Sequence, residues 1–216
     1  MNRATRDKLV SGTVQTELTS GNACWETPPA IYEALNRDFG PFDVDLTADA
    51  QRHLCPVWFG PDSNVGAFDA LTADWGTAGT NGYSNPPYGR FIQQILEKAK
   101  LESLRGFSST LLLPMRITKA FKEHVLVGAS DLLFCSRRIT FFEDGIPRIG
   151  EERRTKKGKV CKPHGDGAVF DSMIVRYRPG ARALNVGLWE VPKHVTAEDL
   201  ARAVARRAIG DMERIA

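Results

Sequence analysis

The chain has 216 residues, a net charge of +3, and a composition that is 42% hydrophobic and 25% charged. These values are typical of a soluble globular protein, and the length suits one α/β domain with a single core. The sequence has neither a basic start followed by an apolar stretch nor a run of eighteen apolar residues, so no signal peptide or membrane span is indicated and a cytoplasmic location is expected.

The first part of the chain predicts an arm, a helix and a strand. Residues 1–22 are polar, rich in Ser and Thr, and without periodicity, which predicts a loose N-terminal arm. Thr27 is the expected N-cap of a helix that has Pro28 at its first position and ends at Gly40. A strand is expected to follow at residues 42–46.

The central part alternates strands with helices. Loops and short strands are predicted for residues 51–80, and a short strand at residues 82–84 precedes a helical apolar repeat across residues 91–99. The apolar run at residues 107–113 predicts a strand that is buried on both faces. Thr118 is expected to cap the helix that follows this strand.

Further strands are expected at residues 132–134, 139–142 and 168–177. A capping-box pattern at Thr196 and Asp199 predicts a last helix, whose apolar stripe is expected to pack on the domain; dimerisation and DNA contact are the alternatives. Strands that alternate with helices favour a mostly parallel sheet, with an antiparallel pair near the end.

Three segments are therefore predicted. Residues 1–22 form the arm, residues 23–180 form the main domain, and residues 181–216 form a C-terminal extension with the amphipathic helix. The main domain includes a basic loop at residues 151–166. Six basic and two acidic residues lie between Glu151 and His164, which gives this segment a charge of +4 and leaves −1 for the rest of the chain. Such a segment can neutralise phosphates of DNA or RNA, and a solvated loop is the alternative.

The four cysteines, Cys24, Cys55, Cys135 and Cys161, are widely spaced and contain no Cys-x-x-Cys pair. This spacing argues against a zinc ribbon, and no metal is expected. His53 and Cys55 are interpreted as ordinary, partly buried side chains rather than as metal ligands.

The most informative feature is the motif Asn85-Pro86-Pro87-Tyr88. The nitrogen lone pair of a heteroaromatic amine is delocalised into the ring, so a catalyst must draw that nitrogen toward tetrahedral geometry. The Asn85 side-chain carbonyl and the Pro86 main-chain carbonyl can each accept one amine N–H. The two prolines hold these acceptors rigid. Tyr88 supplies a ring on which a flipped-out base can stack.

The surroundings of this motif support a functional interpretation. It follows the short strand at residues 82–84 and precedes a helix, so it is expected at the carboxyl end of a strand, where open α/β sheets bind ligands. A proline-rich turn that only ends the strand is the alternative.

Several motifs occur in the order found in the phage-type DNA N6-adenine methyltransferases, which the chain resembles over roughly residues 24–178. The motifs that carry the resemblance are Trp25-Glu26-Thr27-Pro28, Leu35-Asn36 with Phe39-Gly40, Asp43-Val44-Asp45-Leu46-Thr47-Ala48-Asp49, Asn85-Pro86-Pro87-Tyr88-Gly89-Arg90 and Leu112-Leu113-Pro114-Met115-Arg116. Each flanking motif is weak alone, and their shared order makes the match specific.

The resemblance implies an α/β fold: the Rossmann-like, mostly parallel sheet of S-adenosylmethionine-dependent methyltransferases, with flanking helices. Asp45 would hold the cofactor near its methionine part, and Asp69 or Asp74 would contact the adenosine end. The implied cofactor-binding residues are Trp25, Thr27, Pro28, Asp45, Leu46, Asp69 and Asp74. Turn, cap or core roles are the alternatives for these residues. One departure is Thr47-Ala48-Asp49, which stands where many methyltransferases have a glycine-rich turn.

The implied activity is that of a phage or prophage enzyme that flips an adenine out of double-stranded DNA and transfers a methyl group to its N6. The catalytic residues would be Asn85, Pro86, Pro87 and Tyr88. The candidates for DNA contact are Arg90, Arg116, Arg138, Arg153, Arg154, Lys156 and Lys157. Neither a metal nor a membrane is expected as a partner, and the sequence leaves the recognition site and oligomeric state open.

Other readings use the same motif. The target amine could belong to cytosine N4, to an RNA base or to a protein glutamine, and the basic segment disfavours the last of these. A protein of a different class, a non-catalytic DNA-binding protein on the same scaffold, is a further alternative. A Rossmann-type dehydrogenase is disfavoured because no Gly-x-Gly-x-x-Gly follows the strand that ends near Asp45.

Overall fold

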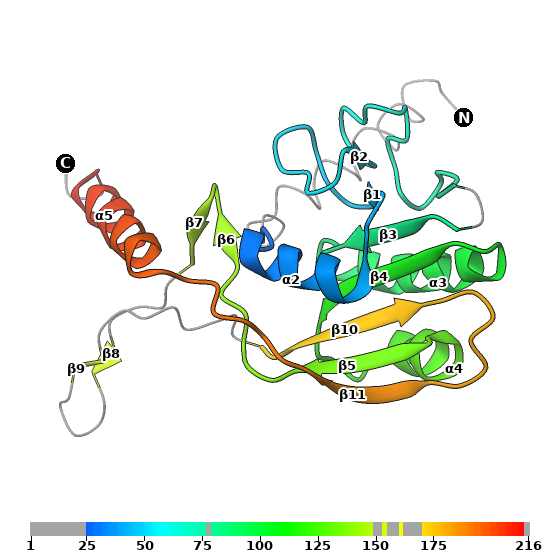
Figure 1. Ribbon diagram of the computed structural model, residues 1–216. Helices are drawn as coiled ribbons and strands as arrows, with labels where there is room; N and C mark the ends of the chain where they lie inside the picture. Colours follow the sequence, from blue (N-terminus) through cyan, green and yellow to red (C-terminus); the bar gives the residue numbers. More distant parts are fainter. Residues whose placement is uncertain (1–24, 77–78, 149–152, 155–159, 162–169, 214–216) are drawn as a thin grey trace, which may run out of the picture.

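The computed structural model describes residues 25–76, 79–148, 153–154, 160–161 and 170–213 (Figure 1). Its helices are α2 (Pro29–Phe39), α3 (Arg90–Leu104), the π-helical turn η1 (Phe121–Val125), α4 (Leu126–Gly128) and α5 (Ala197–Glu213). Its strands are β1 (Val44–Asp45), β2 (Val57–Trp58), β3 (Asn81–Ser84), β4 (Ser108–Pro114), β5 (Asp131–Cys135), β6 (Phe142–Glu143), β7 (Ile146–Pro147), β8 (Arg153–Arg154), β9 (Val160–Cys161), β10 (Ser172–Tyr177) and β11 (Asn185–Trp189).

The central feature is a seven-stranded sheet in the order β11-β5-β10-β4-β3-β1-β2. Neighbouring strands are parallel except for β10, which lies between β4 and β5 and runs antiparallel to both. The expected mixed α/β class, with a mostly parallel sheet and an antiparallel strand late in the chain, is confirmed. Because β11 pairs with β5, the sheet extends past residue 180 into the predicted C-terminal extension.

Helices cover both faces of this sheet (Figure 1). On β4, Leu111 and Leu113 belong to the apolar cluster that contains α3 and η1 side chains, whereas Leu112 belongs to the cluster on the α2 face. All three leucines are fully buried. The continuous apolar run therefore reflects a strand with a core on each side, as expected of strands in a covered parallel sheet.

The first helix begins one residue later than predicted. Pro28 is the N-cap and Pro29 the first helical residue, so the assignment of Thr27 as N-cap and Pro28 as N1 was wrong. The Thr27 hydroxyl instead lies 2.7 Å from the Tyr83 hydroxyl on β3. The Thr27 side chain therefore makes a tertiary hydrogen bond instead of capping the helix. Gly40 ends the helix as predicted.

The predicted strand at residues 139–142 was also wrong in its extent. Only Phe142 and Glu143 form a strand, β6, which pairs with β7 in a separate two-stranded sheet. Residues 139–141 are buried but do not pair with a strand. Their apolar character therefore reflects burial in the core and not membership of a β-sheet. The helix predicted after Thr118 forms as η1 and α4, and the Thr118 hydroxyl accepts the Phe121 N–H at 3.2 Å.

Helix α5 begins with the predicted capping box. The Thr196 hydroxyl accepts the Asp199 N–H at 3.1 Å, and the Asp199 carboxylate accepts the Thr196 N–H at 2.9 Å. The helix contacts β7 and stands apart from the main sheet (Figure 1). Ala203 is buried, whereas Val204 is 47% exposed, so the sheet does not cover the predicted apolar stripe at this position.

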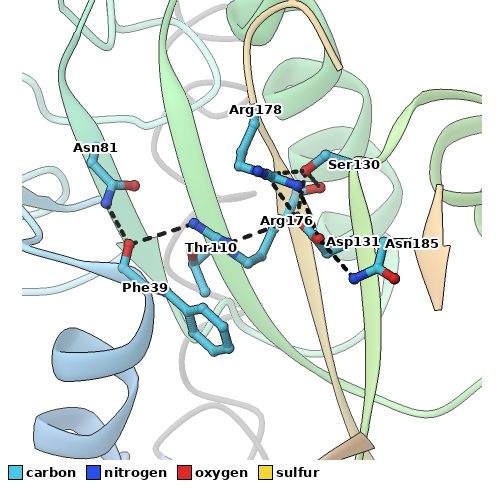
Figure 2. Close-up of polar contacts among 8 residues, drawn as sticks. All are labelled: Phe39, Asn81, Thr110, Ser130, Asp131, Arg176, Arg178 and Asn185. Carbon is cyan, nitrogen blue, oxygen red and sulfur yellow. Dashed lines mark hydrogen bonds and ion pairs between the residues drawn. The ribbon is translucent and has the colours of Figure 1, made fainter. Parts of the chain in front are cut away.

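A polar network lies at the amino edge of the parallel strands (Figure 2). At its centre is Asp131, the first residue of β5, which is only 5% exposed. Its carboxylate accepts hydrogen bonds from Ser130 at 2.8 Å and from Arg178 at 2.9 and 3.1 Å. Arg176 Nη1 lies 3.7 Å from the same carboxylate, and the Arg176 guanidinium also lies 4.6 Å from the Phe39 ring centroid. The network ties β5, β10 and α2 together.

Across the described helices, none combines the length and the apolar character needed to cross a membrane.

Candidate active site

The Asn85–Tyr88 motif lies in the turn between β3 and α3. Gly89, the N-cap of α3, has a φ of 115°, a value that side-chain-bearing residues rarely adopt. The glycine thus allows the chain to turn sharply from the motif into the helix. Since β3 is parallel to β1 and β4, the motif lies at the carboxyl edge of the sheet, as predicted.

The Asn85 amide is held in one orientation. Its Nδ2 donates to the Trp25 main-chain carbonyl at 2.6 Å, and because a carbonyl can only accept, the amide must present its nitrogen to Trp25. The Asn85 Oδ1 is buried and has no hydrogen-bond partner among the described residues. An unsatisfied buried acceptor costs about 1–3 kcal/mol. A buried carbonyl without a donor is therefore the arrangement expected of a group that accepts a hydrogen bond from a substrate.

Tyr88 lies in an aromatic cluster with Trp25, Phe141 and Phe170. The Trp25 ring centroid lies 6.0 Å from that of Tyr88, and Phe170 meets Tyr88 edge to face at 5.3 Å. Trp25 and Phe170 stack at 5.2 Å, and Phe141 lies 5.5 Å from Trp25. Burial raises the pKa of Tyr88, and the charge of Arg116 offsets only part of this effect, so the phenol is neutral. Its hydroxyl and the Trp25 indole N–H are also buried without a described partner.

Asp45 ends β1, next to β3 and on the same edge of the sheet as Asn85. Its carboxylate is 4% exposed and accepts the Leu54 N–H at 3.1 Å and the Thr47 N–H at 3.4 Å. Burial raises the pKa of Asp45 to about 6, although the two backbone hydrogen bonds act in the opposite direction. At neutral pH the site therefore holds a buried carboxylate whose two hydrogen-bond donors, the Thr47 and Leu54 N–H groups, are neutral.

This raised pKa predicts a pH-dependent stability difference between the wild type and Asp45→Asn. The folded pKa of about 6 exceeds the ordinary value of 3.8, so Asp45 favours folding below pH 4 and loses this contribution as the pH rises through 6. Each pH unit between the two pKa values corresponds to about 1.4 kcal/mol. From pH 4 to 7, the free energy of unfolding of the wild type should therefore fall by up to about 3 kcal/mol relative to the variant.

Urea unfolding of both proteins at pH 4, 5, 6 and 7 measures this difference. The amide of the variant loses one of the two backbone hydrogen bonds, and the stability that this costs is independent of pH. A stability difference that stays constant over the four pH values would contradict the prediction.

The neighbours of Asp45 link the two strand ends. Leu46 is fully buried and donates its N–H to the Tyr83 carbonyl, and the Thr47 hydroxyl lies 2.7 Å from the Ser84 hydroxyl. Thr27 reaches the same strand through Tyr83. The structure thus brings Thr27, Leu46 and Asp45 together around the end of β3.

The two candidate acidic residues for the adenosine end lie in different places. Asp69 is exposed and lies two residues from Ala67, whose carbonyl accepts the Gly60 N–H just beyond β2. Asp74 forms an ion pair with Arg105 at 3.0 Å, beside the amino end of β4. The structure does not bring Asp74 to the edge that carries Asn85, which leaves Asp69 as the better placed candidate.

A cavity of about 1070 Å³ opens beside Thr27 and Leu54. The start of α2, the loop at residues 51–54, the β6–β7 hairpin and residues 193–202 line it. Neither Asn85 nor Tyr88 lines this cavity, so it adjoins the motif without containing it.

Three of the arginines predicted to contact DNA lie at the carboxyl edge. Arg90 begins α3, Arg116 follows β4, and Arg138 follows β5; all three are exposed. Arg138 forms an ion pair with Asp171 at 3.0 Å. Arg153 and Arg154 form β8, but their side chains are not among those described. Lys156 and Lys157 lie outside the described residues.

Several residues around the motif were not predicted from the sequence. Phe170 and Phe141 complete the aromatic cluster, and Arg148 lies 4.7 Å from the Trp25 ring centroid. The Glu26 carboxylate accepts the N–H groups of Asp144 and Gly145 at 3.0 and 2.9 Å. These contacts span more than a hundred residues, and no local pattern predicts them.

Within the described part of the chain, no group of three or more His, Cys, Asp or Glu side chains could hold a metal ion. The His53 ring stacks on Trp58 at 4.2 Å, and the Cys55 thiol lies 3.2 Å from the Tyr32 hydroxyl. Burial raises the pKa of Cys55 to about 12.

Two comparisons with known proteins bear on this site. A family model described as DNA N-6-adenine-methyltransferase (Dam) matches residues 15–163, which is more than half of the chain. The protein named "Putative methyltransferase YfdM" of Escherichia coli (strain K12) is 35% identical over 68 residues, which cover 30% of this chain and 69% of that protein.

Proposed function

Because the chain belongs to the DNA N-6-adenine-methyltransferase (Dam) family, we propose that it transfers a methyl group from S-adenosylmethionine to N6 of an adenine flipped out of double-stranded DNA. The observation that carries this proposal is the free Asn85 Oδ1, a buried acceptor beside the aromatic Tyr88 at the carboxyl edge of the sheet.

Asn85 and Pro86 would activate the amine. The Asn85 Oδ1 and the Pro86 carbonyl each accept one N–H of the target, which turns the nitrogen lone pair toward the methyl donor. The hydrogen bond from Asn85 Nδ2 to Trp25 fixes the direction of the acceptor before the substrate arrives. Such preorganisation avoids reorientation during the reaction.

Tyr88 would stack on the extruded base. In the structure, the ring centroids of Trp25 and Phe170 lie within 6.0 Å of the Tyr88 centroid. A base can therefore stack on Tyr88 only if one of these two rings moves away. Phe170 lies two residues before β10 and after the basic segment. We therefore assign the displacement to Phe170. Base stacking would offset the few kcal/mol that extrusion from the duplex costs.

The residues at the end of β1 fit a cationic methyl donor. S-adenosylmethionine supplies an activated methyl group on a positively charged sulfur. Each Asp45 oxygen accepts one backbone N–H and keeps further acceptor capacity, and the carboxylate is buried beside β3. A cation bound nearby would lower the pKa of Asp45 from about 6 and stabilise the carboxylate. The sheet order, with β10 antiparallel between β4 and β5, supports a Rossmann-like methyltransferase fold.

DNA would approach the carboxyl edge. Arg90, Arg116 and Arg138 project from three successive turns on this edge, and the segment from Glu151 to His164 carries a charge of +4. These charges can contact phosphates on both sides of the extruded base.

The test is incubation of the purified protein with methyl-labelled S-adenosylmethionine and unmethylated duplex DNA, followed by digestion and mass spectrometry of the nucleosides. Labelled N6-methyladenine is the expected product. Labelled N4-methylcytosine would support methyl transfer to an exocyclic amine but contradict adenine as the target base. No labelled nucleoside, despite measurable cofactor binding, would contradict DNA as the substrate.

A further inference from the structure

Unpartnered buried polar atoms are concentrated around the Asn85–Tyr88 motif. Among the described residues, seven buried side-chain nitrogen or oxygen atoms lack a hydrogen-bond partner. Three of them belong to Trp25 and to the two motif residues that contact it: Trp25 Nε1, Asn85 Oδ1 and the Tyr88 hydroxyl. Buried polar groups are nearly always paired, so such a concentration indicates a missing polar ligand. The proposed chemistry uses the Asn85 acceptor but leaves the Trp25 donor without a role.

Asn85 and Trp25 offer complementary groups. The Asn85 Oδ1 can only accept a hydrogen bond, and the indole Nε1 can only donate one. An adenine presents the reverse pattern on its Watson–Crick edge, with the N6 amine as donor and the adjacent ring nitrogen N1 as acceptor. Guanine and thymine present a keto oxygen beside a ring N–H, which would place acceptor against acceptor and donor against donor.

We propose that Trp25 Nε1 donates a hydrogen bond to the ring nitrogen adjacent to the target amine, while Asn85 Oδ1 accepts the amine N–H. This inference rests on the proposed function and deepens it. Trp25 becomes a specificity-determining residue of the base pocket rather than a wall of the cofactor pocket. The pair selects bases whose Watson–Crick edge carries an exocyclic amine beside an acceptor ring nitrogen. Adenine and cytosine have this edge, whereas guanine and thymine present a ring N–H at the second position.

The surroundings of Trp25 hold this donor in place. Its main-chain carbonyl is bonded to Asn85, so the two recognition groups move together. The adjacent Glu26 forms a backbone bridge with Phe142, with both hydrogen bonds at 2.9 Å. The indole itself lies 4.7 Å from the Arg148 guanidinium, a contact that does not involve the displaced Phe170. A cation over the ring polarises the indole and strengthens its N–H as a donor.

The test combines Trp25→Phe with modified DNA. The variant keeps an aromatic ring but lacks the N–H. The modified site is first located with the wild-type enzyme, and kcat/KM is then measured on duplexes that carry adenine, 1-deazaadenine or 7-deazaadenine at the target. In 1-deazaadenine a C–H replaces N1, so the acceptor is missing. On adenine and on 7-deazaadenine, the variant should lose about tenfold in kcat/KM. On 1-deazaadenine, the two proteins should be equal.

Trp58→Phe is the matched control, because Trp58 also carries a buried, unpartnered indole N–H but lies on β2. The ratio of kcat/KM for Trp58→Phe to kcat/KM for the wild type should be the same on all three duplexes. An equal loss for Trp25→Phe on every duplex, or a loss that disappears on 7-deazaadenine instead, would overturn the inference while leaving the proposed function intact. Absence of any DNA methylation by the wild type would instead overturn the proposed function.

The wild type provides a second readout in case Trp25→Phe does not fold. It should methylate 7-deazaadenine about tenfold more efficiently than 1-deazaadenine. Equal efficiency on the two analogues would also overturn the inference.

Discussion

Replacement of Asn85 by alanine is expected to lower kcat for methyl transfer by at least about a hundredfold, with little change in DNA affinity. The variant loses the buried acceptor Oδ1, and removal of one preorganised polar group from a reacting centre typically costs about 10²–10³ in rate. DNA affinity should persist because it depends on the exposed arginines and the basic segment. Single-turnover methylation and a fluorescence-based DNA-binding titration measure the two quantities separately.

Asn85→Asp is the informative companion variant. An ionised aspartate keeps an acceptor but cannot donate to the Trp25 carbonyl, which lies 2.6 Å from Asn85 Nδ2 in the structure. The carboxylate would face a carbonyl oxygen and should turn away or take up a proton. A protonated aspartate can again donate to Trp25 and accept from the amine. The activity of this variant relative to the wild type should therefore rise as the pH falls.

A pH-independent ratio between Asn85→Asp and the wild type would contradict the positioning role of the Trp25 carbonyl. Full methyl-transfer activity of Asn85→Ala would contradict catalysis at this motif. DNA binding without methylation, by the wild type and the variant alike, would favour a protein that binds DNA without modifying it.

The sequence predicted the motif and its place in the fold because both depend on local information. The amine chemistry needs only the residue types at positions 85–88, and the strand before and the helix after them carry their own periodicity. The buried strand β4 and the capping box of α5 were predictable for the same reason. In each case, the residues that determine the structure are neighbours in the chain.

The remainder of the site depends on contacts between distant segments. Thr27 matched an N-cap, but its partner is Tyr83, 56 residues away. The group that orients Asn85 is a main-chain carbonyl at Trp25, and main-chain groups leave no trace in residue identity. Phe170 joins Tyr88 only because β10 runs antiparallel through the middle of the sheet. These positions follow from topology, which residue patterns determine only coarsely.

The Asp131 network is a second example, and it predicts the largest effect on stability. Asp131 is buried with two arginines around it, Arg176 with its side chain 15% exposed and Arg178 with its side chain 50% exposed (Figure 2). Burial would raise the pKa of Asp131, but hydrogen bonds from Ser130 and Asn185 and the charge of Arg178 hold it below the ordinary value. Burial also lowers the pKa of Arg176, which shows how costly its charge is to desolvate.

Asp131→Ala would leave the Arg176 charge buried without a counter-ion. Loss of one partner of a buried ion pair costs about 3–5 kcal/mol, and urea unfolding at pH 7 should show a decrease of this size in the free energy of unfolding. Asp171→Ala is the matched control. It breaks an ion pair with Arg138 in which both side chains are more than half exposed, at 53% and 56%, so the change should stay within about 1 kcal/mol.

Asp131→Asn removes the charge of this side chain and keeps its shape, so it isolates the contribution of the charge to stability. Because the pKa of Asp131 is lowered in the folded protein, its carboxylate stabilises the wild type above pH 3.8, and this contribution is lost as the pH falls through the folded value. The stability advantage of the wild type over Asp131→Asn should therefore be largest at neutral pH and shrink on acidification. This direction is opposite to the one expected for Asp45, whose pKa is raised. An advantage that grew toward acidic pH would show that Asp131 is protonated in the folded protein, and the network would then be held by neutral hydrogen bonds rather than by charge.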